Sequence, residues 1–522
     1  MERKWWTLIA VSVAIFMLLL DITVVNVALP DIQRSLHSSF SDLQWVVNAY
    51  SLTLAAFLLT AGALADRFGR RLVFVTGLVI FTLSSAACGL AGTPLALNLA
   101  RAVQGTGGAM MFATSLALIA QAFRGRDRGV AFGVFGGVIG AAVAVGPVVG
   151  GVITSGIGWE WIFFVNVPIG VLGVILTLTQ VSESRDPDAQ GVDWLGLVTF
   201  SGSLFLLVFA LIEGNEKGWG STRIVGFLSA SLVLIVLFVI VERAQRRPML
   251  DLTLFRRPAF AGASIVAFAI SASMFAMFLY LTLYIQDVLG YSPLHAGLRF
   301  LPITLLSFAV APIAGRLSVR VPVRLLLGSG LLLVSAGLLA MTAVDASSGW
   351  TVLIPGFLLA GAGIGLINPP LASTAIGVVH YSRSGMASGI NNTFRQVGIA
   401  TGIAGLGAIF QHDVTRNTTA ALSSGAGREV LQHTAHGKLM TALVSGEVGH
   451  LAHGLPPAAS AALMHSYRVG FTEAFTSILT IAAMVALTGA VFAFALVRAR
   501  DFVSSESAPS AEQPAPAVGA AG

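Results

Sequence analysis

Charged residues are scarce in this chain. Asp, Glu, Lys and Arg make up 10% of its 522 residues, whereas a soluble domain usually carries about 25%. Hydrophobic residues make up 56%, and the mean hydropathy is +0.85. This composition excludes an ordinary soluble protein. It predicts an all-α integral membrane protein, because a chain of this length can hold many spans of about 20 residues.

Features of enzymes and nucleotide-driven pumps are also missing. Cys88 is the only cysteine, so no disulfide can form within the chain, and the residue is most simply apolar packing. No Gly-x-x-x-x-Gly-Lys-Ser/Thr loop occurs, which argues against ATP-driven export. The histidines of residues 411–468 have no metal-ligand spacing. We therefore expect no catalytic residue, no metal site and no cofactor.

The net charge of +6 does not indicate a nucleic-acid partner, because the basic residues lie between apolar segments rather than in a soluble domain. The first apolar segment contains Asp21 and is too long for a signal peptide, so we expect an uncleaved helix. Fourteen transmembrane helices are predicted near residues 7–29, 46–65, 71–92, 95–120, 129–153, 162–181, 193–212, 223–241, 260–286, 295–315, 322–343, 350–378, 386–411 and 474–498.

The positions of arginine predict the topology. Loops on one side of the membrane hold most of the basic residues, which marks that side as cytoplasmic. An even number of helices then places both termini in the cytoplasm. The residues assigned to this side are Arg67, Arg70, Arg71, Arg124, Arg126, Arg128, Arg243, Arg246, Arg247, Arg256, Arg257, Arg316, Arg320, Arg324, Arg383, Arg498 and Arg500. The acidic segment 182–193 departs from this pattern, but acidic residues count little in the rule.

An internal repeat organises the helices. Residues 62–71 and 315–324 close the second and tenth helices with similar sequences, and residues 128–133 and 383–389 open the fifth and thirteenth. Such a parallel repeat is typical of transporters that bind substrate between two halves. The expected parts are a six-helix bundle at 1–190, an inserted helix pair and linker at 191–250, a second six-helix bundle at 251–500 with a long outer loop at 411–468, and a disordered tail at 501–522.

Asp21 lies deep inside the first apolar segment, where no neighbour in the sequence can neutralise it. A charged carboxylate near the middle of a bilayer costs at least about 2.5–3.5 kcal/mol, so such groups usually face a cavity or titrate. Poor solvation favours the uncharged form, so Asp21 is our candidate for proton coupling. The alternatives are a side chain that reaches water at a helix end and one permanently paired with an arginine of another helix. Asn26, in the same segment, is a candidate for the substrate cavity.

The fourth predicted helix carries Asn98, Arg101 and Gln104 at three-residue spacing, which places them on one face. Arg101 cannot realistically lose its proton, so we expect it to act on a carboxylate or to orient water. The alternative is purely structural pairing. Arg101 therefore joins Asp21 as a proton-coupling candidate, and Gln104 is a candidate for the cavity wall.

Two glycine-containing motifs predict moving parts. Residues 62–71 combine a tight turn with charged side chains, which predicts a conformational latch formed by Gly62, Asp66, Arg67, Gly69, Arg70 and Arg71. In the fifth helix, Gly146 and Pro147 precede Gly150 and Gly151, a pattern that allows a bend and close packing. A simple positive-inside loop and a bare kink are the respective alternatives.

The second half contributes further candidates for the cavity wall. Asn368 precedes two prolines, which predicts an interruption of the twelfth helix that exposes backbone carbonyls. Asn392, Arg395 and Gln396 form a polar patch with Asn391 on the thirteenth helix. On the ninth helix, Phe275, Phe278, Tyr280 and Tyr284 could stack on a planar or cationic ligand, although packing is the commoner role of such aromatics.

These motifs together resemble those of the major facilitator superfamily. Residues 62–71 resemble its loop signature, 99–108 its fourth-helix motif and 146–151 its fifth-helix antiporter motif. Residues 20–30 and 159–170 resemble the fourteen-helix drug:proton antiporter branch. The resemblance implies that the latch holds the two halves together in the outward-open state and that the fifth-helix motif serves antiport. Ala142 and Glu160 depart from the family pattern, where Gly and often Arg are usual.

The sequence and the resemblance predict proton-coupled efflux of amphipathic drugs or secondary metabolites by alternating access. The alternatives are a proton symporter or facilitator for a small polar metabolite, and a non-transporting membrane sensor. We expect a monomer in a bacterial cytoplasmic membrane, with the lipid bilayer, protons and a small amphipathic substrate as its partners.

Overall fold

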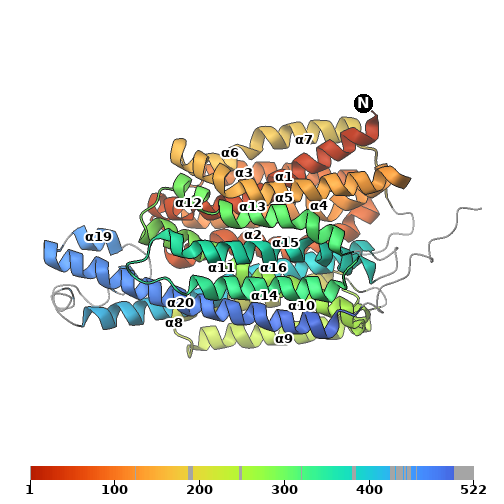
Figure 1. The fold of residues 1–522 in the computed structure, drawn as a ribbon. Helices are drawn as coiled ribbons and strands as arrows, with labels where there is room; N and C mark the ends of the chain where they lie inside the picture. The colour runs from red at the N-terminus through yellow and green to blue at the C-terminus, as the bar shows by residue number, and fades with distance from the viewer. Residues whose placement is uncertain are drawn as a thin grey trace, which may run out of the picture.

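The computed structural model describes residues 2–498 apart from 124, 186–191, 246–247, 249, 319, 379–383, 424–429, 431–438, 440–441, 444–447 and 454. Helices are the only regular elements in these residues (Figure 1). The α-helices are α1 (Arg3–Leu36), α2 (Phe40–Phe68), α3 (Arg70–Gly89), α4 (Pro94–Ala122), α5 (Gly125–Gly156), α6 (Trp161–Phe164), α7 (Asn166–Gln180), α8 (Trp194–Lys217), α9 (Thr222–Ala244), α10 (Pro258–Ile270), α11 (Ala276–Leu283), α12 (Pro293–Arg299), α13 (Leu301–Leu317), α14 (Val323–Met341), α15 (Ile354–Gly377), α16 (Ser384–Leu422), α19 (Val448–His453) and α20 (Pro457–Leu496).

Four shorter segments complete the order. They are the 3₁₀ turns η1 (Leu252–Arg256) and η4 (Trp350–Leu353) and the π-helical turns η2 (Ser271–Phe275) and η3 (Tyr284–Val288). The π turn η2 interrupts a single long pass between α10 and α11, and η3 forms the end of that pass. Such turns within a helix are frequent at functional sites.

Helix starts follow local sequence chemistry. Ser39 and Asp42 form a reciprocal capping box at α2, because each side chain accepts from the other residue's backbone N–H. Thr93 accepts from the N–H of Ala96 at the start of α4, where Pro94 occupies the first helical position. These short polar turns end one pass and begin the next.

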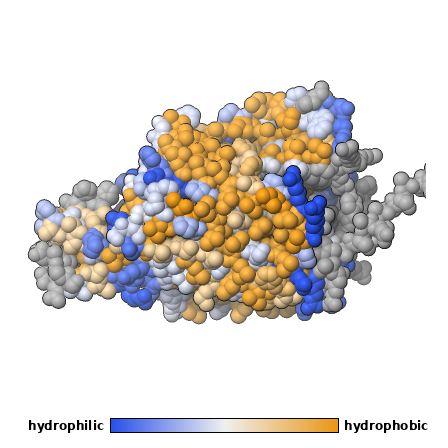
Figure 2. Space-filling model, in the orientation of Figure 1, coloured by the Kyte–Doolittle hydropathy of each residue, from blue (hydrophilic) through white to orange (hydrophobic). Residues whose placement is uncertain are grey.

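The described chain makes fourteen passes in one bundle, as predicted. Thirteen of them are long and apolar enough to cross a membrane, and α16 supplies the remaining pass. Figure 2 shows a broad hydrophobic band between hydrophilic fringes, as a bilayer requires. The chain is a multi-pass membrane protein.

The two ends of the bundle differ in charge. We call the end that holds the turns after α2, α4, α7, α9, α13 and α20 the basic end, and the other the opposite end. The basic end carries Arg3, Lys4, Arg67, Arg70, Arg71, Arg185, Arg243, Arg256, Arg257, Arg316, Arg320, Arg324 and Arg498. The first described residues and the end of α20 both lie there (Figure 1). Arg124, Arg246, Arg247, Arg383, Arg500 and the tail at 501–522 lie outside the described residues.

The expected outer loop at 411–468 is wrong at both of its ends. Helix α16 continues to Leu422 and α20 begins at Pro457, and both project beyond the bundle at the opposite end with α19 (Figure 1). Leu422 and Leu463 belong to an apolar cluster at this projection. The sequence there lacks a long apolar run because these turns pack on each other rather than on lipid.

We call α1–α7 the first half, α8–α9 the insert and α10–α20 the second half. Helix α8 packs against α2 of the first half and α16 of the second half. Leu52 of α2, Val208 of α8 and Ala404 of α16 share one apolar cluster. Asn215 of α8 donates to the carbonyl of Ala408 at 2.5 Å. The insert therefore covers the seam between α2 and α16 on one side of the bundle.

Candidate functional site

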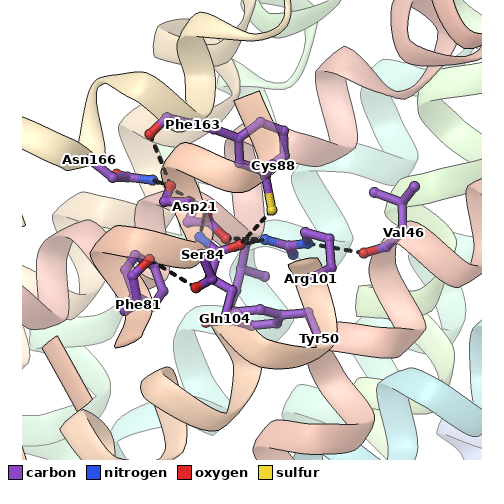
Figure 3. A network of polar contacts seen from close by, with 12 residues as sticks. Asp21, Val46, Tyr50, Phe81, Ser84, Cys88, Arg101, Gln104, Phe163 and Asn166 are labelled. Carbon is purple, nitrogen blue, oxygen red and sulfur yellow. Dashed lines mark hydrogen bonds and ion pairs between the residues drawn. The ribbon is translucent and has the colours of Figure 1, made fainter. Parts of the chain in front are cut away.

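Asp21 lies in the middle of α1 and is 2% exposed. Its Oδ2 accepts from Arg101 Nη1 at 2.5 Å, and its Oδ1 accepts from Gln104 Nε2 at 2.9 Å and Asn166 Nδ2 at 3.2 Å. These donors come from α4 and from the start of α7, and the group is drawn in Figure 3. The carboxylate is thus held by one cation and two neutral amides.

Arg101 is buried, and partners from several helices hold its Nε and Nη1. Its Nε donates to the carbonyl of Val46 on α2 at 3.1 Å, and Nη1 also donates to Gln104 Oε1 at 2.7 Å. The guanidinium carbon lies 4.3 Å from the ring centroid of Tyr50, a cation–π distance. Figure 3 shows the side chain between Asp21 and the Val46 carbonyl. The face shared by Arg101 and Gln104 is therefore the face that meets α1.

Asn166, Ser85 and Cys88 extend the network beyond what the sequence analysis assigned. Asn166 Nδ2 also donates to Ser85 Oγ at 3.0 Å, and Ser85 Oγ donates to the carbonyl of Phe163 at 2.9 Å. The Cys88 thiol donates to Gln104 Oε1 at 3.6 Å, so it has a polar contact as well as packing. Asn166 stands within the 159–170 motif, but only its contact with Asp21 shows its place in the network.

In the conformation seen here, Asp21 has the arginine partner that the sequence analysis named as an alternative. The carboxylate is paired with Arg101 of α4, and Gln104 and Asn166 donate to its other oxygen. Removing one member of a buried ion pair usually costs about 3–5 kcal/mol, because the other charge is left without compensation. Either substitution of this pair is therefore expected to be costly.

Asp66 of the predicted latch pairs with its own neighbour on the chain. Its Oδ1 accepts from Arg70 Nη2 at 2.9 Å and from Arg70 Nε at 3.1 Å. Arg67 lies over the ring of Phe68, with 5.4 Å to the centroid. Gly62 lies within α2 with open space where a side chain would stand. The described contacts of Asp66 remain within the first half.

Glu183, not Asp66, accepts from the first amides of α3. Its carboxylate oxygens accept from the N–H groups of Arg71 at 2.9 Å and Leu72 at 3.1 Å, and Arg71 Nε lies 3.8 Å from it. Gly69 has a φ of 121°, and a Cβ there would lie 2.7 Å from the Glu183 carboxyl carbon. Glu183 therefore has a structural role: its carboxylate caps the start of α3.

The glycines of the fifth-helix motif bring three helices together. A Cβ at Gly146 would lie 1.8 Å from Thr23 Oγ1 on α1, and one at Gly150 would lie 2.9 Å from the carbonyl of Val24. Gly151 meets α12 of the second half, and a Cβ at Gly297 of α12 would lie 2.2 Å from the carbonyl of Pro147. The motif thus packs beside Asp21 on α1 and against the second half at once.

The polar patch of the second half forms one described contact between helices α15 and α16. Arg395 Nη2 donates to Asn368 Oδ1 at 2.5 Å, and Asn392 Nδ2 donates to the carbonyl of Ser388 on its own helix. Gln396 is half-buried, and its side-chain oxygen has no hydrogen bond in the described structure. The expected interruption at Asn368 is wrong, because α15 runs without a break through the two prolines.

The remaining cavity candidates are Tyr280 and Tyr284, which share one apolar cluster, and Asn26 of α1. Tyr280 is fully buried and donates to the carbonyl of Ile403 at 2.6 Å. Tyr284 is stacked on Phe475 at 4.9 Å between ring centroids. Asn26 donates to the carbonyl of Ile22 on its own helix. In this conformation both tyrosines pack within the protein.

Comparisons with known proteins agree with this architecture. A sequence model described as Major Facilitator Superfamily matches residues 11–403. The chain is 39% identical to "Multidrug resistance protein Stp" of Mycobacterium tuberculosis strain CDC 1551 / Oshkosh, over 77% of this chain and 75% of that protein. It is 33% identical to "Tetracenomycin C resistance and export protein" of Streptomyces glaucescens, over 78% and 76%.

A solved structure shares the fold at low sequence identity. It is a bacterial homologue of the human lysosomal transporter Spinster in an inward-facing, occupied conformation, with a TM-score of 0.64 and 17% identity. The match covers 96% of this chain and 99% of that one. It supports the arrangement of the helices.

Proposed function

The chain belongs to the major facilitator superfamily, and from this premise we propose that it exports amphipathic drugs or secondary metabolites in exchange for protons. The relatives named above are resistance and export proteins. The single observation that carries the coupling proposal is the buried pair of Asp21 and Arg101 inside the first half. An embedded charge pair serves no need of a scaffold or sensor, and its cost favours a functional role.

In this proposal Asp21 alternates between an ionised and a protonated state. When ionised, it holds Arg101, Gln104 and Asn166 as described. When protonated, it no longer attracts the guanidinium, which keeps the Val46 carbonyl and the Tyr50 ring as partners. Substrate and proton then favour different arrangements of the first half, so that the binding of one opposes the binding of the other. This competition is the requirement for exchange.

We place the basic end in the cytoplasm, which puts both termini there by the positive-inside rule. In the described part of the chain, the hydrogen bonds that join the two halves lie toward the opposite end. They link Gln286 to Val27, Gln44 to Ile403, and the N–H of Leu294 to Ser155. This is the pattern expected of an inward-facing state. Asn368, Asn392, Arg395 and Gln396 are then candidates to meet substrate that enters from the basic end.

The latch is disengaged in such a state, because Asp66 contacts Arg70 rather than the second half. Asp66→Asn should therefore leave the inward-facing state nearly unchanged in stability, since an exposed i,i+4 pair contributes only about 0.3–0.5 kcal/mol. It should lower the population of the outward-facing state if the latch closes there. Labelling of single cysteines at the opposite end measures this population. Equal labelling of wild type and variant would count against a latch.

Drug accumulation in cells tests the function itself. Cells that make the protein should retain less of an exported drug than cells without it, and an uncoupler of the proton gradient should remove the difference. A symporter would raise accumulation, and a sensor would leave it unchanged once expression of other exporters is held constant. Export that survives the uncoupler would contradict proton coupling.

A further inference from the structure

Two buried glutamines join the halves near the opposite end. Gln44 Nε2 on α2 donates to the carbonyl of Ile403 on α16 at 2.9 Å and lies 3.4 Å from the Tyr280 hydroxyl. Gln286 Nε2 on η3 donates to the carbonyl of Val27 on α1 at 2.7 Å. Gln44 is 0% and Gln286 is 6% exposed. Both bonds must break when the halves separate at this end, so both favour the closed arrangement.

The first-half helices in these bonds, α1 and α2, also contact the charge pair. Helix α1 carries Asp21 and, six residues later (21 to 27), the carbonyl of Val27. That separation is about 9 Å along a helix. Helix α2 offers the Val46 carbonyl to Arg101, and Gln44 lies two residues earlier (44 to 46). Each helix thus contacts the charge pair on one side and the second half on the other.

Asn48 lies on the same face of α2 as Gln44, but it disfavours the closed arrangement. It follows Gln44 by four residues and precedes Leu52 by four, so the three side chains share a helix face. Leu52 lies in an apolar cluster with Ala404 of α16, which places this face toward the second half. Asn48 is 0% exposed, and neither polar atom of its side chain has a hydrogen bond in the described structure. A buried unpaired amide destabilises the closed seam and is relieved when water enters.

We propose that Gln44 and Gln286 are positioning residues that couple the charge state of Asp21 to opening of the opposite end, and that Asn48 keeps the closed seam from becoming too stable. The two glutamines favour the closed arrangement of the seam between the halves, and Asn48 favours the open one. A small shift of α1 and α2 can therefore change which arrangement is populated. The use of Asp21 as the proton carrier rests on the proposed function. The role of the two glutamines in closure does not.

Distances between spin labels test closure directly. Cysteines introduced at Gly92 and Ala343 place spin labels in two turns of the opposite end, one in each half. The control is the protein without these two changes, in which the buried Cys88 is the cysteine present. Gln44→Leu and Gln286→Leu should each raise the ratio of open to closed distances about fivefold, the equivalent of one hydrogen bond. Asn48→Leu should lower it about fivefold by the same reasoning.

A matched control removes a similar bond within one half. Ser335 donates to the carbonyl of Ala483 at 2.8 Å between α14 and α20, so Ser335→Ala should leave the ratio unchanged. Alanine at positions 44 and 286 repeats the test without added bulk. Unchanged distances in both glutamine variants, or equal changes in Ser335→Ala, would overturn the role in closure.

Coupling is tested by combining variants. Asp21→Asn should shift the ratio toward the open class, because the uncharged side chain no longer holds Arg101 between α1 and α2. In the Gln44→Leu/Gln286→Leu background the same change should produce no further shift. A shift of equal size in both backgrounds would overturn the coupling. Failure of the proposed function would appear separately, as a wild type whose transport ignores the proton gradient.

Discussion

Asp21→Asn is expected to abolish export driven by a pH gradient while leaving a folded, membrane-inserted protein. Asparagine keeps the size of the side chain and an oxygen that can accept from Gln104 and Asn166, but it cannot bind or release a proton. Vesicles loaded with the purified variant should show no substrate movement when a pH gradient is imposed. The same vesicles should still exchange labelled for unlabelled substrate if net proton movement is unnecessary for exchange.

The matched control is Asn26→Asp combined with Asp21→Asn. Asn26 lies on the same helix and bonds only to Ile22 of its own chain segment among the described contacts. A new carboxyl there should not restore coupling to Asp21→Asn. Full gradient-driven transport by Asp21→Asn would move the proton site elsewhere, with Glu213, Asp287 and Glu473 the next carboxylates to test.

Arg101→Met is expected to lower stability even more than Asp21→Asn does, because it removes the bonds of Arg101 to the Val46 carbonyl and to Gln104 as well as one charge of the pair. The change leaves Asp21 buried without its cation, and breaking such a pair by removing one partner costs about 3–5 kcal/mol. The purified variant should lose its folded form at a much lower temperature than wild type. Thermal unfolding in detergent, followed by the intrinsic fluorescence or by gel filtration, measures this loss.

The double variant Asp21→Asn/Arg101→Met separates stability from coupling. It removes both charges, so most of the stability lost in Arg101→Met should return. Transport should not return, because no proton carrier remains. A single variant Arg101→Met as stable as wild type would contradict a stabilising contribution of the ion pair described here.

Sequence reasoning found both charges of the site because each stands out against an apolar background. A charged side chain at position 21 or 101 costs free energy inside a membrane, whichever way it points. That Asp21 and Arg101 meet could not be read from either segment, since α1 and α4 are separated by two other passes. The supporting residues Asn166 and Tyr50 were not assigned roles because a neutral polar side chain in a helix is common and acquires meaning only from its partner.

Predictions from the local sequence also failed where contacts between distant segments determine the structure. Glu183 belongs to the acidic segment that departs from the charge pattern of the loops, and its carboxylate caps α3 beside Gly69. The segment after residue 411 lacks a long apolar run, yet α16 and α20 continue as helices because they pack on each other outside the main bundle. Gln44 and Gln286 gave no signal, since their acceptors are backbone carbonyls of distant helices.

Proton release on substrate binding tests the central claim most directly. Purified wild-type protein, held in detergent in a weakly buffered solution with a pH indicator, should release protons when an exported drug is added, because drug and proton compete for one state of the Asp21 network. Asp21→Asn should bind the drug and release none. Equal proton release by both proteins, at equal drug binding, would contradict the assignment of Asp21 as the proton carrier.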